Sequence, residues 1–202
     1  MHVAIPELES PVKLVLDPEH LLTDDQYFAF CMANSNLSIE RTARGEIVIV
    51  PPAGGESDYR RVDVSSQLHV WARKDGRSTA FGSSVEFILP SSAALSPDAA
   101  WVSREKIDRL TKEERRKFLR LVPDFVAEVM SPSDRLPTVH AKMDEWIANG
   151  VPLGWLIDGD AQTFYVYRIG RPMEKLTGLT SLPGDGPVAG FVLDLTAIWA
   201  GL

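Results

Sequence analysis

The sequence predicts an α/β fold in which a mixed β-sheet is flanked by helices within a single domain. Segments with helical and strand-like patterns follow one another along the chain, which is typical of a mixed layout. The run Phe125–Met130 is short and apolar and lies between Pro123-Asp124 and Ser131-Pro132, as expected of a buried strand. A length of 202 residues and a hydrophobic content of 45% fit one domain. We expect an N-terminal arm over residues 1–20 and the domain over 21–202.

Charge and cysteine content restrict the classes of function. The chain has 28 acidic and 21 basic residues and a formal charge of −7, which argues against a strong non-specific nucleic-acid binder. A single cysteine, Cys31, excludes an internal disulfide and a cysteine-based zinc site, and fits a cytoplasmic location. No apolar run approaches the ~20 residues that span a bilayer, so we expect no contact with a membrane.

The first elements of the domain are a helix and a pair of strands. Thr23 and Gln26 have the spacing of a capping box, which predicts a helix that ends near Asn34. Residues 39–50 predict two strands about a turn. Glu40 begins the first of them and, judged on this segment alone, is a solvated charge at a strand end.

A helix from about Asp58 to Lys74 should follow, capped by Ser57 or by Asp58 itself and stopped by Gly76. One face of this helix is apolar, with Val64, Leu68 and Trp71 at helical spacing. Its other face carries charges that can face water, namely Arg60, Arg61, Asp63 and Arg73.

The middle of the chain predicts short strands and one charged helix. Residues 79–89 are a strand pair or one bent strand, and Asp98 opens a further short strand that ends near Val102. Thr111 and Glu114 again have capping-box spacing and predict a surface helix. Its charges indicate a solvated face or, less simply, a contact for phosphates.

Glu128 lies inside the central apolar strand. Because strand side chains alternate between faces, it shares its side with Val126 and Met130, where an unpaired carboxylate would be costly. It is either a carboxylate paired with Arg or Lys, a residue on the wet face of an edge strand, or a metal-binding or acid/base group.

The segment after this strand predicts a helix that Ser133 or Asp134 caps and that ends near Asn149. Its apolar stripe consists of Leu136, Val139, Met143 and Ile147. Lys142 and Trp146 are four residues apart on the border of that stripe. Lys142 can lay its stem on the core and point its ammonium toward the end of the preceding strand, where Glu128 needs a partner.

The last part of the chain predicts a strand hairpin over residues 151–158 and 162–168. The remainder is expected to be loop, closed by a final strand or helical turn over residues 191–199.

Two strands therefore carry acids, Asp98 and Glu128, and the next helix carries Lys142. Two converging carboxylates can bind a hard divalent cation such as Mg²⁺, which can activate water and stabilise charge on a phosphodiester. A nearby ammonium would orient the water or steady the developing charge.

Several segments resemble a known family in the same order along the chain. The segments SPDAAWV, PDFVAEVMSPSD, AKMDEWIANGVPLGWLID, TFYVYR and ERTARGEIVIVPPAGGES are similar to the large bacterial family of restriction-endonuclease-like proteins within the PD-(D/E)XK nuclease superfamily. The resemblance covers roughly residues 20–200. It implies a restriction-endonuclease-like core and nuclease chemistry that depends on Mg²⁺, with Mn²⁺ as a substitute.

The resemblance also implies roles for particular residues. Asp98 and Glu128 would be the metal ligands, and Glu40 would be the supporting acid of the core's first element. The superfamily signature places a lysine two residues after the glutamate, but this chain has Met130 there. The resemblance carries the lysine role to Lys142.

The leading hypothesis is a metal-dependent endonuclease with DNA as its substrate. Against it stand the acidic charge and the lack of a recognisable DNA-reading motif. The alternative is a nuclease fold without catalysis that binds nucleic acid or protein. A hydrolase based on histidine is weakly supported, because the four histidines are scattered; His140 is the one with a chance of facing the Lys142 cleft.

A homodimer would gather basic residues into a track for DNA. They are Arg60, Arg61, Arg115, Arg116, Lys117 and Arg120.

Overall fold

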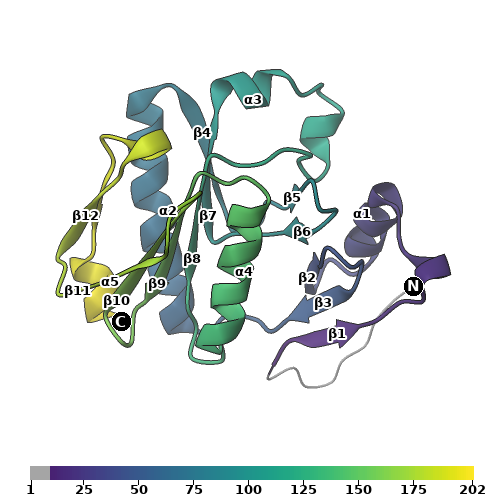
Figure 1. The fold of residues 1–202 in the computed structure, drawn as a ribbon, viewed down its shortest axis with the longest axis horizontal. Coiled ribbons are helices and arrows are strands. Elements are labelled where there is room, and N and C mark those ends of the chain that lie inside the picture. Colours follow the sequence, from purple (N-terminus) through teal and green to yellow (C-terminus); the bar gives the residue numbers. More distant parts are fainter. Residues whose placement is uncertain (1–9) are drawn as a thin grey trace.

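A six-stranded sheet forms the centre of the molecule (Figure 1). The computed structural model describes residues 10–202. The strands of this sheet, in the order β11-β10-β9-β8-β7-β4, are β11 Glu174–Thr177, β10 Thr163–Arg168, β9 Leu153–Asp158, β8 Phe125–Val129, β7 Ala99–Ser103 and β4 Ser78–Gly82. All neighbours are antiparallel except β8 and β9, which are parallel and are joined through helix α4, Leu136–Ala148. The predicted mixed sheet is therefore confirmed.

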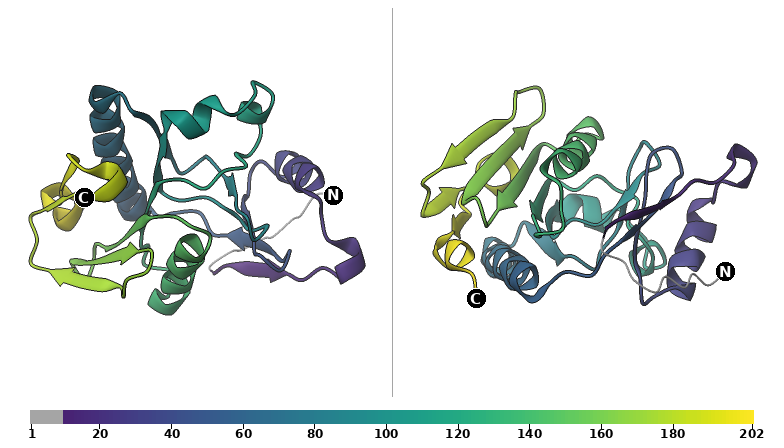
Figure 2. Two further views of the ribbon diagram at one scale, coloured as in Figure 1. Left: turned by 45° about the horizontal axis from the view of Figure 1, so that its top comes forward. Right: turned by 90° about the horizontal axis from the view of Figure 1, so that it is seen from below.

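A second, five-stranded sheet lies at one end of the molecule, beside helix α1, Asp24–Ala33 (Figure 2). Its strands are short, and in sheet order they are β1 Val12–Leu14, β3 Ile47–Val50, β2 Ser38–Arg41, β6 Ala94–Leu95 and β5 Phe87–Ile88. A two-stranded sheet of β12, Ser181–Pro183, and β13, Val192–Asp194, lies toward the other end.

The remaining elements are helical. They are α2 Gly55–Asp75, α3 Arg104–Asp108, α5 Thr196–Ala200 and the 3₁₀ turns η1 Pro18–His20, η2 Glu114–Arg116 and η3 Gly186–Val188. Within residues 10–202, no helix combines the length and apolar character that a membrane span requires.

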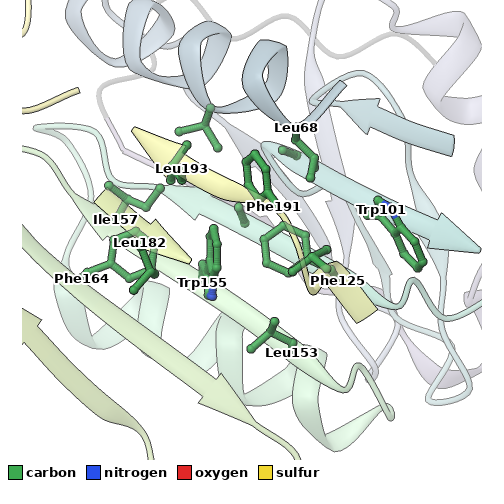
Figure 3. Packing of buried hydrophobic residues seen from close by; sticks show 14 of the residues in the cluster. Leu68, Trp101, Phe125, Leu153, Trp155, Ile157, Phe164, Leu182, Phe191 and Leu193 are labelled. Atoms are coloured by element: carbon green, nitrogen blue, oxygen red, sulfur yellow. The ribbon is translucent and has the colours of Figure 1, made fainter. Parts of the chain in front are cut away.

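The inner strands of the large sheet are buried on both faces because helices cover each side. Every residue of β8 is buried, as expected for a strand with a layer on each face. On one face, Leu68 of α2 packs with Trp101, Phe125 and Trp155 in the cluster that Figure 3 shows. On the other face, α4 contributes its apolar stripe and Trp146, which is fully buried.

Several predicted features are confirmed. The capping box of Thr23 and Gln26 starts α1, Gly76 ends α2 in a left-handed conformation, and the β9–β10 hairpin forms. Residues 39–50 form the predicted pair, β2 and β3.

Some helix boundaries differ from the predictions because the predicted caps do not begin the helices. Helix α2 begins at Gly55, before the predicted caps, and α4 begins only at Leu136, because Asp134 accepts hydrogen bonds within a turn from Ser131 instead of capping the helix. The capping box of Thr111 and Glu114 forms, but only the single turn η2 follows it.

The strands of residues 79–89 and the ends of the chain also differ in part from the predictions. β4 and β5 belong to different sheets. Helix α3 was not predicted, and the segment expected to be loop after residue 168 contains β11 and β12. The closing segment forms both β13 and α5. Of the predicted arm over residues 1–20, residues 1–9 lie outside the described part, and Val12–Leu14 pair with β3.

Candidate active site

The two predicted acids of the large sheet lie on neighbouring strands. Ala99 of β7 pairs with Ala127 of the antiparallel strand β8. Asp98 precedes Ala99 and Glu128 follows Ala127, so both acids lie one step beyond that pair at the same end of the sheet. Asp98 Oδ2 accepts a hydrogen bond from the backbone N–H of Val129 at 2.7 Å. Both carboxylates are buried. The structure therefore brings the two acids together although 29 residues separate them along the chain.

Lys142 of α4 contacts two of the acids predicted for the site, Glu128 and Glu40. Its Nζ lies 3.0 Å from Glu128 Oε1 and 2.8 Å from Glu40 Oε1. It also donates a hydrogen bond to the backbone oxygen of Ser96 at 2.9 Å. An ammonium has three donors, so these three contacts match its capacity.

The position of Lys142 follows from how closely α4 packs on the sheet. Gly154 of β9 has no side chain, and a Cβ there would lie 2.5 Å from Met143 Cε, so a larger residue would require the end of the Met143 side chain to move. Trp146, one turn after Lys142, donates from Nε1 to Glu128 Oε1 at 3.0 Å. Lys142 and Trp146, on the predicted border of the apolar stripe, thus both donate to the buried carboxylate of Glu128.

Glu40 comes from β2 of the small sheet. Its Oε1 accepts a hydrogen bond from the backbone N–H of Ser96 at 3.0 Å in addition to the contact with Lys142. The site therefore joins the two sheets, and Glu40 is not the solvated charge that its own segment indicated.

Arg61 of α2 is a member of the cluster that the sequence did not reveal. Its Nε lies 3.0 Å from Asp98 Oδ1 as an ion pair, although the angle is too poor for a hydrogen bond. The side chain is 25% exposed. In the sequence, Arg61 was one of four charges on the water-facing side of a helix, and no local pattern distinguished it from the others.

Burial and charge shift the pKa values of the cluster. Burial raises the pKa of Glu128 to about 7, against the opposing effect of Lys142. Burial likewise raises the pKa of Asp98, although Arg61 and Lys142 oppose the shift. Burial alone would lower the pKa of Lys142, but the carboxylates of Glu128 and Glu40 outweigh it, so the amine stays protonated.

The donor set fits a hard divalent cation. Carboxylate oxygens are the ligands that Mg²⁺ prefers. In direct ion pairs, Asp98, Glu128 and Glu40 contact Lys142 and Arg61, so the contacting acids outnumber the contacting bases by one. Among residues 10–202, no three His, Cys, Asp or Glu side chains are arranged as a ready metal site, so a cation would rest on the two acids and on water or substrate oxygens.

Two other residues considered in the sequence analysis lie apart from the cluster. Arg60, expected to face water, is buried and pairs with Glu56 and Asp160 at 2.9 and 2.8 Å. His140 shares a hydrogen bond with the hydroxyl of Tyr167 and stacks edge-on against Tyr165, and no contact joins it to Lys142.

A third buried carboxyl group, Glu86, lies beside the small sheet and was not predicted. The hydroxyl of Tyr27 donates to Glu86 Oε1 at 2.5 Å. Burial raises the pKa of Glu86 to about 8. No cation contacts it among the described residues, in contrast to Glu128. Its partner lies 59 residues away, so no local sequence signal could have revealed it.

Comparisons with known proteins agree with this architecture. A crystal structure of a putative nuclease belonging to DUF820 from Anabaena variabilis ATCC 29413 superimposes with a TM-score of 0.73 at 20% identity, covering 89% of this chain and 98% of that one. No curated protein matches the sequence. The family model described as "Putative restriction endonuclease", Uma2, matches residues 24–196. The chain therefore belongs to the Uma2 family and has a restriction-endonuclease-like fold.

Proposed function

We propose that this protein is a Mg²⁺-dependent endonuclease that hydrolyses phosphodiester bonds in DNA, with Mn²⁺ able to substitute. The single observation that carries the proposal is the contact of the Lys142 ammonium with Glu128 and Glu40 beside Asp98. Membership of a family described as restriction endonucleases and the fold of a nuclease support the same class of reaction.

The charges of the cluster suit a metal ion together with a phosphodiester. The contacting acids outnumber the contacting bases by one, so a divalent cation would offset this excess together with the charge of a phosphodiester. Asp98 and Glu128 would hold the ion. When bound, it would polarise the phosphodiester and lower the pKa of a coordinated water.

Each protein group has a separate task in the proposed reaction. Lys142 remains an ammonium because the carboxylates raise its pKa, so it donates hydrogen bonds and stabilises negative charge and does not accept a proton. Glu40, from the five-stranded sheet, holds the Lys142 ammonium in place. Arg61 has no aligned hydrogen bond within residues 10–202, and its guanidinium can bind a phosphate oxygen at the site's edge.

The test is cleavage of supercoiled plasmid and of single-stranded DNA with Mg²⁺, Mn²⁺ or EDTA. Glu128→Gln keeps the shape of the side chain and removes its charge, and should lower the cleavage rate at least about 100-fold. Asp144→Asn changes an exposed acid on the same helix and serves as the matched control, expected to cut like the wild type. Cleavage that survives EDTA, or equal cleavage by Glu128→Gln and wild type, would exclude this site.

One observation favours a second function, a nuclease fold that binds nucleic acid or protein without cutting. Met130 stands at the usual lysine position, and Lys142 already contacts the Glu128 oxygen. This function predicts that DNA binds while no plasmid is nicked with either metal. The same assay, combined with a gel-shift measurement, separates the two functions.

The homodimer, the cytoplasmic location and the division into arm and domain stay predictions. A homodimer would have to assemble its basic track without Arg60, because that residue is buried in ion pairs. Light scattering of the purified protein tests the assembly directly.

A further inference from the structure

A hollow on the described surface lies at the open edge of the large sheet. It has a volume of about 640 Å³, within the range of ligand pockets. Strand β4 forms that edge, and the hollow is open to solvent and lined by α1, α2, the β4–β5 loop and η2 with the residues that follow it. None of the four predicted site residues lines it.

The hollow adjoins the candidate active site on the Asp98 side. Gly82 lines the hollow and pairs with Ala99, the residue directly after Asp98. Ser65 also lines it and lies one helical turn after Arg61, the partner of Asp98. A strand whose phosphodiester lies at the acids could therefore continue into the hollow.

Aromatic rings form the walls of the hollow. Phe28 and Phe118 meet edge to face with ring centroids 5.0 Å apart, and Phe81 of β4 also lines the hollow. Met32 adds an apolar side chain that is 52% exposed. Rings of this kind stack against nucleic-acid bases, and any base can stack because each has a π-face.

Positive charge lies at the rim of the hollow. The side chain of Arg116 is exposed and has no ion pair or hydrogen bond within residues 10–202. Lys117 is half exposed and pairs with Asp25, itself 74% exposed, so this contact can exchange for a phosphate at little cost.

The acid in the lining does not oppose this charge strongly. Glu86 contributes to the hollow, accepts the hydrogen bond from Tyr27 and has a raised pKa because of burial. A largely neutral carboxyl group at neutral pH can hydrogen-bond a base edge without repelling the strand.

We infer that this hollow binds an unpaired nucleotide of the substrate strand, adjacent to the bond that is cut. The base stacks among Phe28, Phe81 and Phe118, and Arg116 and Lys117 bind the flanking phosphate. A paired base keeps its faces stacked within the duplex, so the hollow selects single-stranded DNA or a frayed strand end. This inference rests on the proposed nuclease function for its substrate, but not for its geometry.

The experiment measures binding of a labelled poly-dT strand and of a duplex of equal length, by fluorescence anisotropy in EDTA, so that no cutting occurs. Arg116→Glu and Phe118→Leu should each weaken binding of the single strand about 10-fold. Phe118→Tyr retains the ring and should bind like the wild type. Duplex binding should change less than 2-fold in all three variants, which is about the effect of losing one exposed contact.

Matched controls guard against effects of net charge and of folding. Arg115→Glu makes the same charge change on the neighbouring residue, which does not line the hollow, and should leave binding unchanged. Met32→Ser and Val70→Ser replace side chains that are 52% and 53% exposed, and only Met32 lines the hollow. Equal losses in Arg115→Glu and Arg116→Glu, or full binding by Phe118→Leu, would overturn the assignment.

Failure of this inference can be told apart from failure of the proposed function. If the wild type cuts and Glu128→Gln does not, while the hollow variants keep strand affinity and KM, the nuclease stands and the nucleotide site is wrong. If nothing cuts but Arg116→Glu and Phe118→Leu lose strand binding, the nucleotide site stands and the protein is a binding module.

Discussion

Two buried glutamates in this protein meet opposite kinds of partner. Glu128 lies at the end of a strand in the large sheet and touches the Lys142 ammonium, whereas Glu86 lies beside the small sheet and accepts a hydrogen bond from the Tyr27 phenol. Both carboxyl groups are about 95% inaccessible, at 5% and 4% exposure, and burial raises the pKa of each. Burial alone therefore does not distinguish a candidate site from a structural group.

The difference lies in whether the surroundings keep charge. Around Glu128, an ammonium and a second carboxylate are charged groups inside the protein. Burying them costs desolvation energy, and a stable fold does not need such charges. Around Glu86, a neutral donor suits a protonated acid. Catalysis or cation binding would use the buried charges around Glu128. The following substitutions test the contrast between Glu128 and Glu86.

Lys142→Met should have the largest effect. Removing the ammonium leaves two buried carboxylates without their shared partner, which should lower the free energy of unfolding by about 3–5 kcal/mol at pH 8. The pKa of folded Glu128 is already raised to about 7, so at pH 5 its protonation relieves much of the loss. Urea unfolding at the two pH values measures both effects.

Lys106→Met is the matched control for this change. Lys106 also pairs with one carboxylate, Asp124 at 2.8 Å, but its side chain is 32% exposed and it lies outside the cluster. It should cost about 1 kcal/mol with little dependence on pH between 5 and 8. Similar losses for both lysines would remove the distinction drawn for the site.

Trp146→Phe should have the next largest effect. The smaller ring keeps most of the packing against Phe87 but removes the N–H that donates to Glu128. The lost hydrogen bond to a buried carboxylate should cost about 1.5–3 kcal/mol, and the proposed cleavage should slow as Glu128 loses its orientation. Chemical unfolding and a cleavage assay on the same preparation test this, and unchanged stability would contradict the role of the indole.

Glu86→Gln should change the pH dependence of stability more than its magnitude at low pH. The pKa of folded Glu86 is raised to about 8 from an ordinary value of 4.5, so the wild type loses stability as the pH rises between these values, by at most about 1.4 kcal/mol per unit. Glutamine cannot ionise, so the variant should keep its stability across that window. Melting temperatures from pH 4 to 9 check the slope; equal slopes would mean that Glu86 is ionised in the folded protein.

Asp98→Asn should have the smallest effect on stability. Burial raises the pKa of Asp98, and asparagine retains an oxygen for the Val129 N–H, so the loss should stay below about 1 kcal/mol. Binding of Mn²⁺, measured by calorimetry, should weaken about 10-fold or more. A large fall in the melting temperature would instead make Asp98 a structural partner of Arg61.

The sequence predicted the parts of the molecule that local patterns encode. The central strand, the apolar stripe of α4 and the β9–β10 hairpin each follow from periodicity and turn residues, and all three form. Lys142 could be placed because it stands one turn before Trp146 on the border of that stripe. The helix then fixes the direction of its side chain.

Contacts between distant segments could not be predicted in this way. Arg61 and Arg60 are adjacent and alike in sequence, yet one pairs with Asp98 and the other with Asp160, because the packing of α2 decides which side each faces. Glu86 had the alternating surroundings of an ordinary strand. The start of α2 was missed because Gly54 begins it without a capping side chain.

The bridge that Lys142 forms between Glu40 and Glu128 makes the first hairpin and the central helix interdependent. A chimera that imports β2 and β3 from a relative would need a compatible residue at position 142 as well, or it would enclose an unmatched charge. Recombination within this fold should therefore succeed at boundaries that transfer both segments together.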